Sequence, residues 1–171
     1  MRKLSKFFLA ISLAFSLTAC GYGSVPETTK MGPAGSGIDS VVGEIKVQEI
    51  LVINDGTTAV LTAVIINSSL ETETLLGATV GNRLVELVET SSGVTKKIDT
   101  IEIPARSSVS LSFAAPLGAL LNNTDAELPT IGTVEKVNFS FAANGFVKVE
   151  ALVFANEGIY STVNPSAFAL N

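Results

Sequence analysis

Between Val42 and Phe154 the chain consists of short apolar runs separated by turn residues, and this pattern restricts the fold more than any other feature. Val109 and Leu111 alternate with serines, and such period-two alternation is typical of a strand with one buried face. Turn signals such as Asn54-Asp55-Gly56 recur about every ten residues. No window in this region favours an amphipathic helix. The sequence therefore predicts an all-β fold, an antiparallel β-sandwich of about eight strands.

Some of these strands can be assigned individually. Thr58 to Asn67 is almost continuously apolar, as expected of a strand buried on both faces. Gly81-Asn82 predicts a hairpin turn between two apolar runs. The other predicted strands are 45–53, 75–80, 84–88, 94–103, 109–113, 137–141 and 147–153. Residues 115–130 form the longest predicted irregular stretch, and a loop of that length is more often functional or mobile than neutral.

The N-terminus carries a second informative pattern. A basic start is followed by an apolar run of 11 residues, Phe7 to Leu17, and then by Leu17-Thr18-Ala19-Cys20. This order is typical of a secretory signal peptide with a small-residue cleavage site. It resembles a bacterial lipobox, in which the thiol of Cys20 receives a diacylglyceryl group before cleavage. Two alternatives remain open, a transmembrane anchor and a cleaved signal with an incidental cysteine, but the run is much shorter than the roughly 20 residues that span a bilayer.

These patterns divide the chain into four predicted parts. Residues 1–19 are a lipoprotein signal peptide, and residues 20–41 are a lipidated N-terminus and a flexible linker rich in Gly, Ser, Pro and Thr. Residues 42–155 form the β-sandwich, and residues 156–171 form a C-terminal tail. Because two acyl chains hold a protein firmly at a bilayer, we expect the domain on the outer, extracytoplasmic face of the cell membrane.

Composition excludes several functions. Without residues 1–19 the chain has 8 basic and 16 acidic side chains, so nucleic acid and anionic headgroups are unfavourable partners. Histidine is absent and Cys20 is the only cysteine, which leaves no Ser-His-Asp triad and no free thiol nucleophile. Glu71 and Glu73 lie in a Thr-rich segment that is best interpreted as a solvated loop. We therefore predict that the protein is not an enzyme.

Metal binding is also disfavoured by the residue types. Cu(I) prefers thiolate or thioether ligands, and Zn or Cu(II) favours imidazole, whereas the mature chain offers only Met31 in the linker. Asn54-Asp55 and the Asn122, Asn123 and Asp125 cluster do not form a calcium loop. Turn formation accounts for both clusters. The sequence predicts no metal and no cofactor.

Several strand motifs resemble a known family. Val64-Ile65-Ile66-Asn67, Leu75-Leu76-Gly77-Ala78, Val85-Glu86-Leu87 and Ile101-Glu102-Ile103-Pro104-Ala105 are similar to segments of the periplasmic copper chaperones called PCu(A)C. The closing hairpin, Val137–Phe141 followed by Gly145–Val149, is similar too. The resemblance covers roughly residues 45–153 and implies a cupredoxin-like or Ig-like sandwich.

The copper ligands of that family do not carry over to this sequence. The His and Met of its "VELHEM" motif correspond to Val88 and Thr90, and its middle Met falls among Thr95 to Lys97. Its His-x-Met pair aligns with Leu117 and Ala119. None of these side chains holds Cu(I). Together with the lipobox, this makes the chain similar to actinobacterial lipoproteins of the LpqE type.

The leading hypothesis is a lipid-anchored, non-enzymatic binding or assembly module. Val88, Thr90, Leu117 and Ala119 would form an apolar patch in place of the metal site, and this patch would receive an envelope protein or an acyl chain. The first alternative is a copper-binding chaperone or metal-trafficking lipoprotein with a non-standard site. The second is a purely structural envelope protein.

Overall fold

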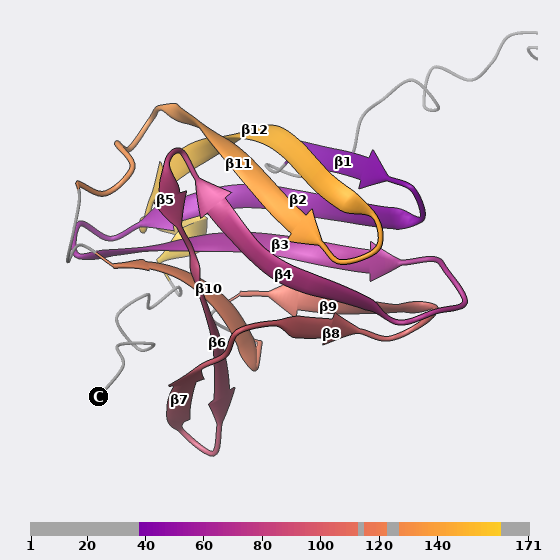
Figure 1. Cartoon of the computed structure of the whole chain (residues 1–171). Coiled ribbons are helices and arrows are strands. Elements are labelled where there is room, and N and C mark those ends of the chain that lie inside the picture. Colours follow the sequence, from indigo (N-terminus) through magenta and orange to yellow (C-terminus); the bar gives the residue numbers. More distant parts are fainter. Residues whose placement is uncertain (1–37, 113–114, 123–126, 162–171) are drawn as a thin grey trace, which may run out of the picture. The chain divides into compact units, whose positions relative to one another are not determined.

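The protein is represented by a computed structural model that describes residues 38–112, 115–122 and 127–161. The predictions for the signal peptide, Cys20, Met31, Asn123, Asp125 and the tail after Ser161 lie outside this part. Within it, the chain forms a sheet of twelve strands and one short 3-10 helix, so the predicted all-β fold is confirmed (Figure 1). No helix of the described residues has the length and apolar character needed to cross a bilayer.

The strands follow one another with short connections. In chain order they are β1 (Ile38–Val42), β2 (Ile45–Asn54), β3 (Thr58–Asn67), β4 (Glu73–Val80), β5 (Arg83–Leu84), β6 (Glu86–Ser91), β7 (Val94–Lys97), β8 (Ile101–Ile103), β9 (Ser107–Leu111), β10 (Leu117–Asn122), β11 (Val134–Phe141) and β12 (Gly145–Ala155). The 3-10 helix η2 (Gly158–Tyr160) follows β12.

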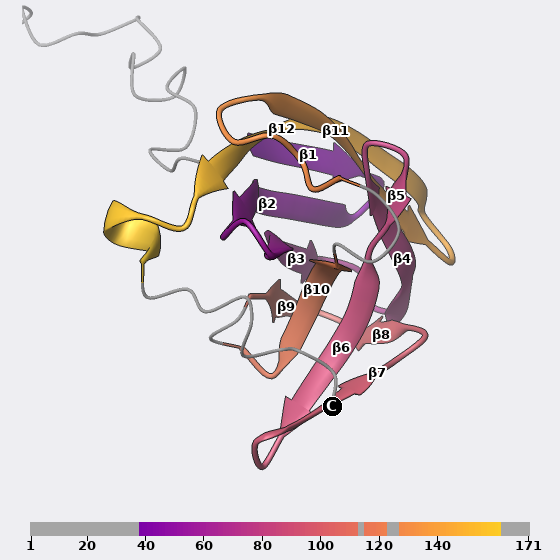
Figure 2. The same ribbon diagram turned by 90° about the vertical axis from the view of Figure 1, so that its left-hand side faces the viewer.

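The strands form two layers that are joined along β12. The order is β5-β4-β11-β12-β2-β3-β9-β10-β6-β7, with β1 added to β2 and β8 added to β4. The first part of β12 is antiparallel to β11, whereas Val153 to Ala155 run parallel to β2. This change of partner curls the sheet around a single interior, as Figure 2 shows.

The core fills the inside of this curl. Val137, Phe139 and Phe141 of β11 are buried, as their alternation with polar residues predicts. No residue of β3 is exposed, but Thr62, Val64 and Ile66 are only partly buried, so the strand is fully buried on one face and not on both as predicted. Two smaller clusters lie apart from the main core, Val60 with Val88 and Leu120, and Leu51 with Ile53.

Two predicted segments are wrong in detail. Residues 94–103 are not one strand, because β7 pairs with β6 in one layer and β8 pairs with β4 in the other. Residues 115–130 are not wholly irregular, because β10 pairs with both β3 and β6. Without polar alternation in Leu117-Gly118-Ala119-Leu120-Leu121, nothing in the local sequence marks this strand.

The predicted hairpin at Gly81-Asn82 is present but short. Thr79 pairs with Leu84 and Val80 with Arg83, after which the chain crosses to the other layer and begins β6. The predicted strand 84–88 is therefore divided between β5 and β6.

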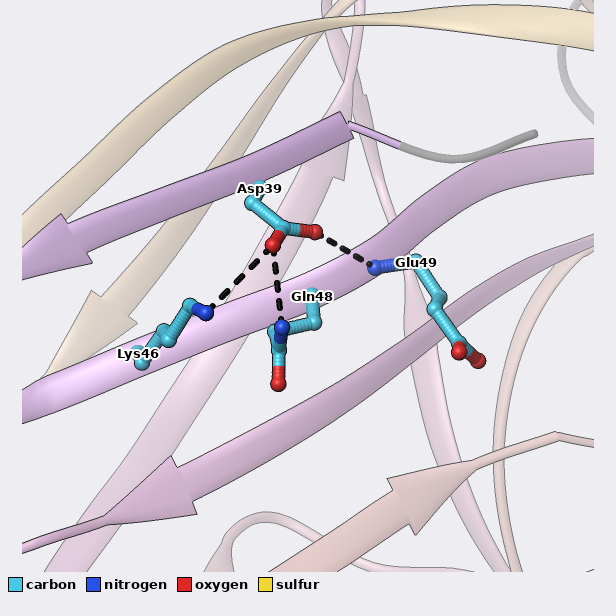
Figure 3. Close-up of polar contacts among 4 residues, drawn as sticks. All are labelled: Asp39, Lys46, Gln48 and Glu49. Carbon is cyan, nitrogen blue, oxygen red and sulfur yellow. Dashed lines mark hydrogen bonds and ion pairs between the residues drawn. The ribbon is translucent and has the colours of Figure 1, made fainter. Parts of the chain in front are cut away.

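The first strand begins inside the predicted linker, so the linker boundary at residue 41 is wrong. The carboxylate of Asp39 accepts hydrogen bonds from Gln48 Nε2 at 2.9 Å and from Glu49 N at 3.3 Å (Figure 3). Lys46 Nζ lies 3.5 Å from the same group. Burial alone raises the pKa of Asp39, but the bonds from Gln48 and Glu49 outweigh it and lower the pKa. These contacts hold β1 against β2 where the pairing register of β2 shifts after Gln48, and they make β1 part of the domain.

Candidate functional site

The residues predicted to replace the copper ligands come together on three neighbouring strands. Antiparallel pairing places Thr90 opposite Thr95 on β6 and β7, and Val88 opposite Gly118 on β6 and β10. Leu117 lies opposite Glu89 in the same register. The Thr90 amide donates a hydrogen bond to Pro116 O at 2.6 Å, which fixes the start of β10 against β6. The residues that the resemblance aligns with the copper ligands therefore lie close together in the fold.

The four predicted patch residues divide between the two faces of this region. Ala119 belongs to the main core, and Leu117 packs against that core while remaining partly exposed. Val88 faces the other way, into the small cluster with Val60 and Leu120. Val88 and Ala119 are both 0% exposed, so neither offers a surface to a partner. Only Thr90 and Leu117 keep exposed area, and they do not make one continuous apolar patch.

The chemistry of this region does not fit copper. The hydroxyl groups of Thr90 and Thr95 are hydrogen-bonded to each other at 3.0 Å, and Lys97 Nζ forms an ion pair with Glu86 Oε1 at 3.0 Å. Over the described ranges there is no His, Cys or Met, and no group of three His, Cys, Asp or Glu side chains is arranged to hold a metal. Hydroxyl and ammonium groups are not ligands for Cu(I).

Comparison with solved structures places this arrangement among known folds. The copper-bound PCuAC domain of PmoF2 superimposes with a TM-score of 0.58 at 21% identity, over 69% of this chain and 98% of that domain. The apo PCuAC domain of PmoF1 gives a TM-score of 0.55 at 18% identity, over 69% and 99%. The chain has the fold of a PCuAC domain. No protein-family model and no curated protein matches its sequence.

The PCuAC-like domain contains a buried carboxylate that sequence reasoning missed. Glu73 is only 3% exposed, which makes its interpretation as part of a solvated loop wrong. Its carboxylate accepts bonds from Asn144 Nδ2 at 2.6 Å, and from the amides of Thr74, Ala143 and Asn144 at 2.7, 3.0 and 3.0 Å. Burial alone raises the pKa of Glu73, but these bonds outweigh it and lower the pKa. The nearby Asn144-Gly145 turn was visible in the sequence, but its contact with Glu73 depends on tertiary structure.

Two open grooves lie away from the copper-ligand positions. One has a volume of about 750 Å³ and lies between the start of β1 and the outer side of β11 and β12. The other has a volume of about 410 Å³ and lies at the ends of β3 and β9. Neither includes Val88, Thr90, Leu117 or Ala119. These two grooves therefore lie apart from the four predicted patch residues.

Proposed function

We propose that this protein is a lipid-anchored, non-enzymatic binding or assembly module on the outer face of the cell membrane. Cys20 would carry the diacylglyceryl anchor, and the linker would connect it to the PCuAC-like domain. The partner would be an envelope protein or a lipid. The proposal keeps the fold of the copper-bound relative but assigns it a role that does not depend on metal.

The observation that carries the proposal is the set of side chains at the ligand positions. Val88, Thr90, Leu117 and Ala119 occupy neighbouring strands, yet none offers a sulfur or imidazole donor. Val88 and Ala119 are packed as core residues, so these positions now contribute to the stability of the fold. The absence of histidine from the whole chain argues in the same direction against a catalytic base.

A Cu(I) titration tests this proposal directly. We expect residues 20–171, with Cys20→Ser and Met31→Leu to remove the two soft donors of that segment, to show no binding tighter than micromolar. The copper-bound PCuAC domain of PmoF2 is the positive control. Tight, stoichiometric binding by the double variant would contradict the proposal and would establish a site built from other donors.

The second candidate, a copper chaperone or metal-trafficking protein, is favoured by one observation, the structural similarity to a copper-bound domain. In this protein, copper would then have to bind at residues other than those aligned with the ligands of that family. Crosslinking mass spectrometry on intact membranes separates the remaining possibilities. A binding module gives a reproducible crosslinked partner, whereas a purely structural envelope protein gives none.

A further inference from the structure

The smaller groove has a lining that differs from the rest of this acidic domain. It lies where β3 ends and β9 begins, and its lining residues are Ile66, Asn67, Ser68, Arg106, Ser107 and Ser108. We propose that this groove binds a phosphate group, held by the guanidinium of Arg106 and by the neighbouring serine hydroxyls. The proposal does not depend on the proposed function, because it concerns a different part of the surface.

The backbone at Arg106 is the first observation. Its φ is +52°, in the left-handed region that disfavours residues with a Cβ atom and that glycine adopts freely. The Arg106 amide donates to Ser69 O at 3.1 Å, which holds the turn between β8 and β9 against the loop that follows β3. The side chain is exposed and forms no ion pair within the described structure. An arginine at a position suited to glycine therefore adds a guanidinium that the fold itself does not use.

The charge of the lining is the second observation. The whole chain has 16 acidic and 11 basic side chains, yet this groove is lined by one guanidinium and by no carboxylate. The larger groove, in contrast, includes Asp39 and Glu150 beside its two lysines. A guanidinium presents a planar fork of donors that matches the oxygens of phosphate. The hydroxyls of Ser68 and Ser108 supply additional donors, and a phosphate group has enough terminal oxygens to accept from several of them.

The third observation is that the groove is held in shape by a buried amide. Asn67 is 1% exposed, and its Nδ2 donates to Glu71 O at 2.8 Å and to Ile103 O at 3.0 Å. Its Oδ1 accepts from Ser69 N at 3.0 Å. The loop that carries Ser68 and the turn that carries Arg106 are thereby tied to one side chain. Because both loops are ordered before a ligand arrives, binding loses less conformational entropy.

Inorganic phosphate is the probe for the first experiment, with the full chain in a non-ionic detergent. We expect the ³¹P signal of phosphate to show saturable binding with a midpoint of order millimolar. Arg106→Gly should weaken binding at least tenfold, and Arg106→Lys should weaken it several-fold because the fork is lost while the charge remains. Ser92→Gly is the matched control, since Ser92 has a φ of +53° and lies in the turn between β6 and β7, outside the groove.

Thermal unfolding of the same variants controls for folding. Both glycine variants relieve a left-handed conformation, so neither should melt below the unsubstituted chain by more than a few degrees. The proposal is overturned if phosphate does not saturate, or if Arg106→Gly and Ser92→Gly bind it equally well.

A second arm identifies the source of the phosphate group. Vesicles of phosphatidylglycerol and of phosphatidylcholine are compared, using the chain with Cys20→Ala so that no acyl anchor contributes. Recruitment to phosphatidylglycerol that Arg106→Gly abolishes would indicate a lipid headgroup. Saturable binding of inorganic phosphate without such recruitment would indicate a free phosphate compound. If inorganic phosphate does not saturate, the proposal is overturned whichever vesicle recruits the chain.

Discussion

Glu73 is a carboxylate with almost no exposed surface, and its hydrogen bonds join the start of β4 to the turn between β11 and β12. It accepts from Thr74, Ala143 and Asn144, so both oxygens have partners. A buried carboxylate is tolerated only when its charge is compensated in this way. Since these bonds favour the ionised form, they lower the pKa of Glu73 below its ordinary value of 4.5.

A lowered pKa fixes the sign of the pH dependence. The contribution of Glu73 to the free energy of unfolding is complete above its unfolded-state pKa and is lost as the pH falls through its folded-state pKa. Glu73→Gln replaces one acceptor oxygen by an NH₂ group that faces amide donors. We expect it to lower the free energy of unfolding by about 1–3 kcal/mol at pH 7. The difference from the unsubstituted chain should shrink as the pH falls below the ordinary pKa of 4.5 and through the lower pKa of the folded state.

Urea unfolding between pH 3 and pH 7 measures this difference. Glu102→Gln is the matched control, because Glu102 is exposed on β8 directly opposite Thr74 and should show almost no effect. If the loss of unfolding free energy in Glu73→Gln did not change with pH, the hydrogen bonds would not be stabilising the ionised form of the Glu73 carboxylate.

At the level of elements, the turn between β1 and β2 packs against the turn between β11 and β12. Gly43 has a φ of +55°, and a Cβ atom added there would overlap Asn144 Oδ1. The same amide donates to Glu73 through its Nδ2 atom. Asn144 therefore couples the two turns to the buried carboxylate, because a small displacement of its side chain affects both its packing against Gly43 and its hydrogen bond to Glu73.

Gly43→Ala tests this unit. A left-handed alanine costs about 1–2 kcal/mol, and the overlap with Asn144 should add to that cost. Gly93→Ala, at a φ of +78° with no atom within 4 Å of the added Cβ, carries the conformational cost without the overlap. Chemical unfolding should rank Gly43→Ala as clearly the less stable of the two. In a double-mutant cycle with Glu73→Gln the two losses should not add, whereas additive losses would separate the turn from the carboxylate.

Strands with one buried face and one solvent-exposed face were predicted from the sequence. β9, β11 and β12 alternate in this way, and each overlaps a predicted strand. β10 was missed because it is paired on both sides and lacks polar alternation. The break between β7 and β8 was missed because it depends on which layer each segment joins, and local sequence does not encode that choice.

The four predicted patch residues lie on neighbouring strands, but the face on which each one lies could not be predicted from the sequence. Alternation along one strand puts Val88 and Thr90 on one face, and Leu117 and Ala119 likewise share a face. Whether the two pairs face the same way depends on the register between β6 and β10. Gly118 lies opposite Val88, so Leu117 and Ala119 share their face with Glu89 and Leu87 instead. A shift of one residue would have brought all four together.

For the whole molecule, the acidic charge and the proposed anchor act in opposite directions at a membrane. With 16 acidic and 11 basic side chains, the chain as a whole is repelled by anionic headgroups. Membrane association would then depend on the acyl chains at Cys20, since the apolar run from Phe7 to Leu17 is short for a transmembrane span. Any attraction at Arg106 is electrostatic and is screened by salt. Hydrophobic anchoring by the acyl chains is not screened by salt. A high-salt wash therefore distinguishes the two contributions to membrane association.

Cys20→Ala should therefore release the protein from membranes. We expect the unsubstituted chain to remain in the membrane fraction after a high-salt wash, and the variant to appear in the soluble fraction or in the medium. Met31→Leu, in the predicted linker, is the control and should stay with the membrane. If Cys20→Ala is retained at low salt and lost at high salt, a charged surface of the domain contributes to association but the acyl group remains the stable anchor. Retention of Cys20→Ala at high salt would mean that an apolar segment other than the acyl group holds the chain, which contradicts the lipobox interpretation.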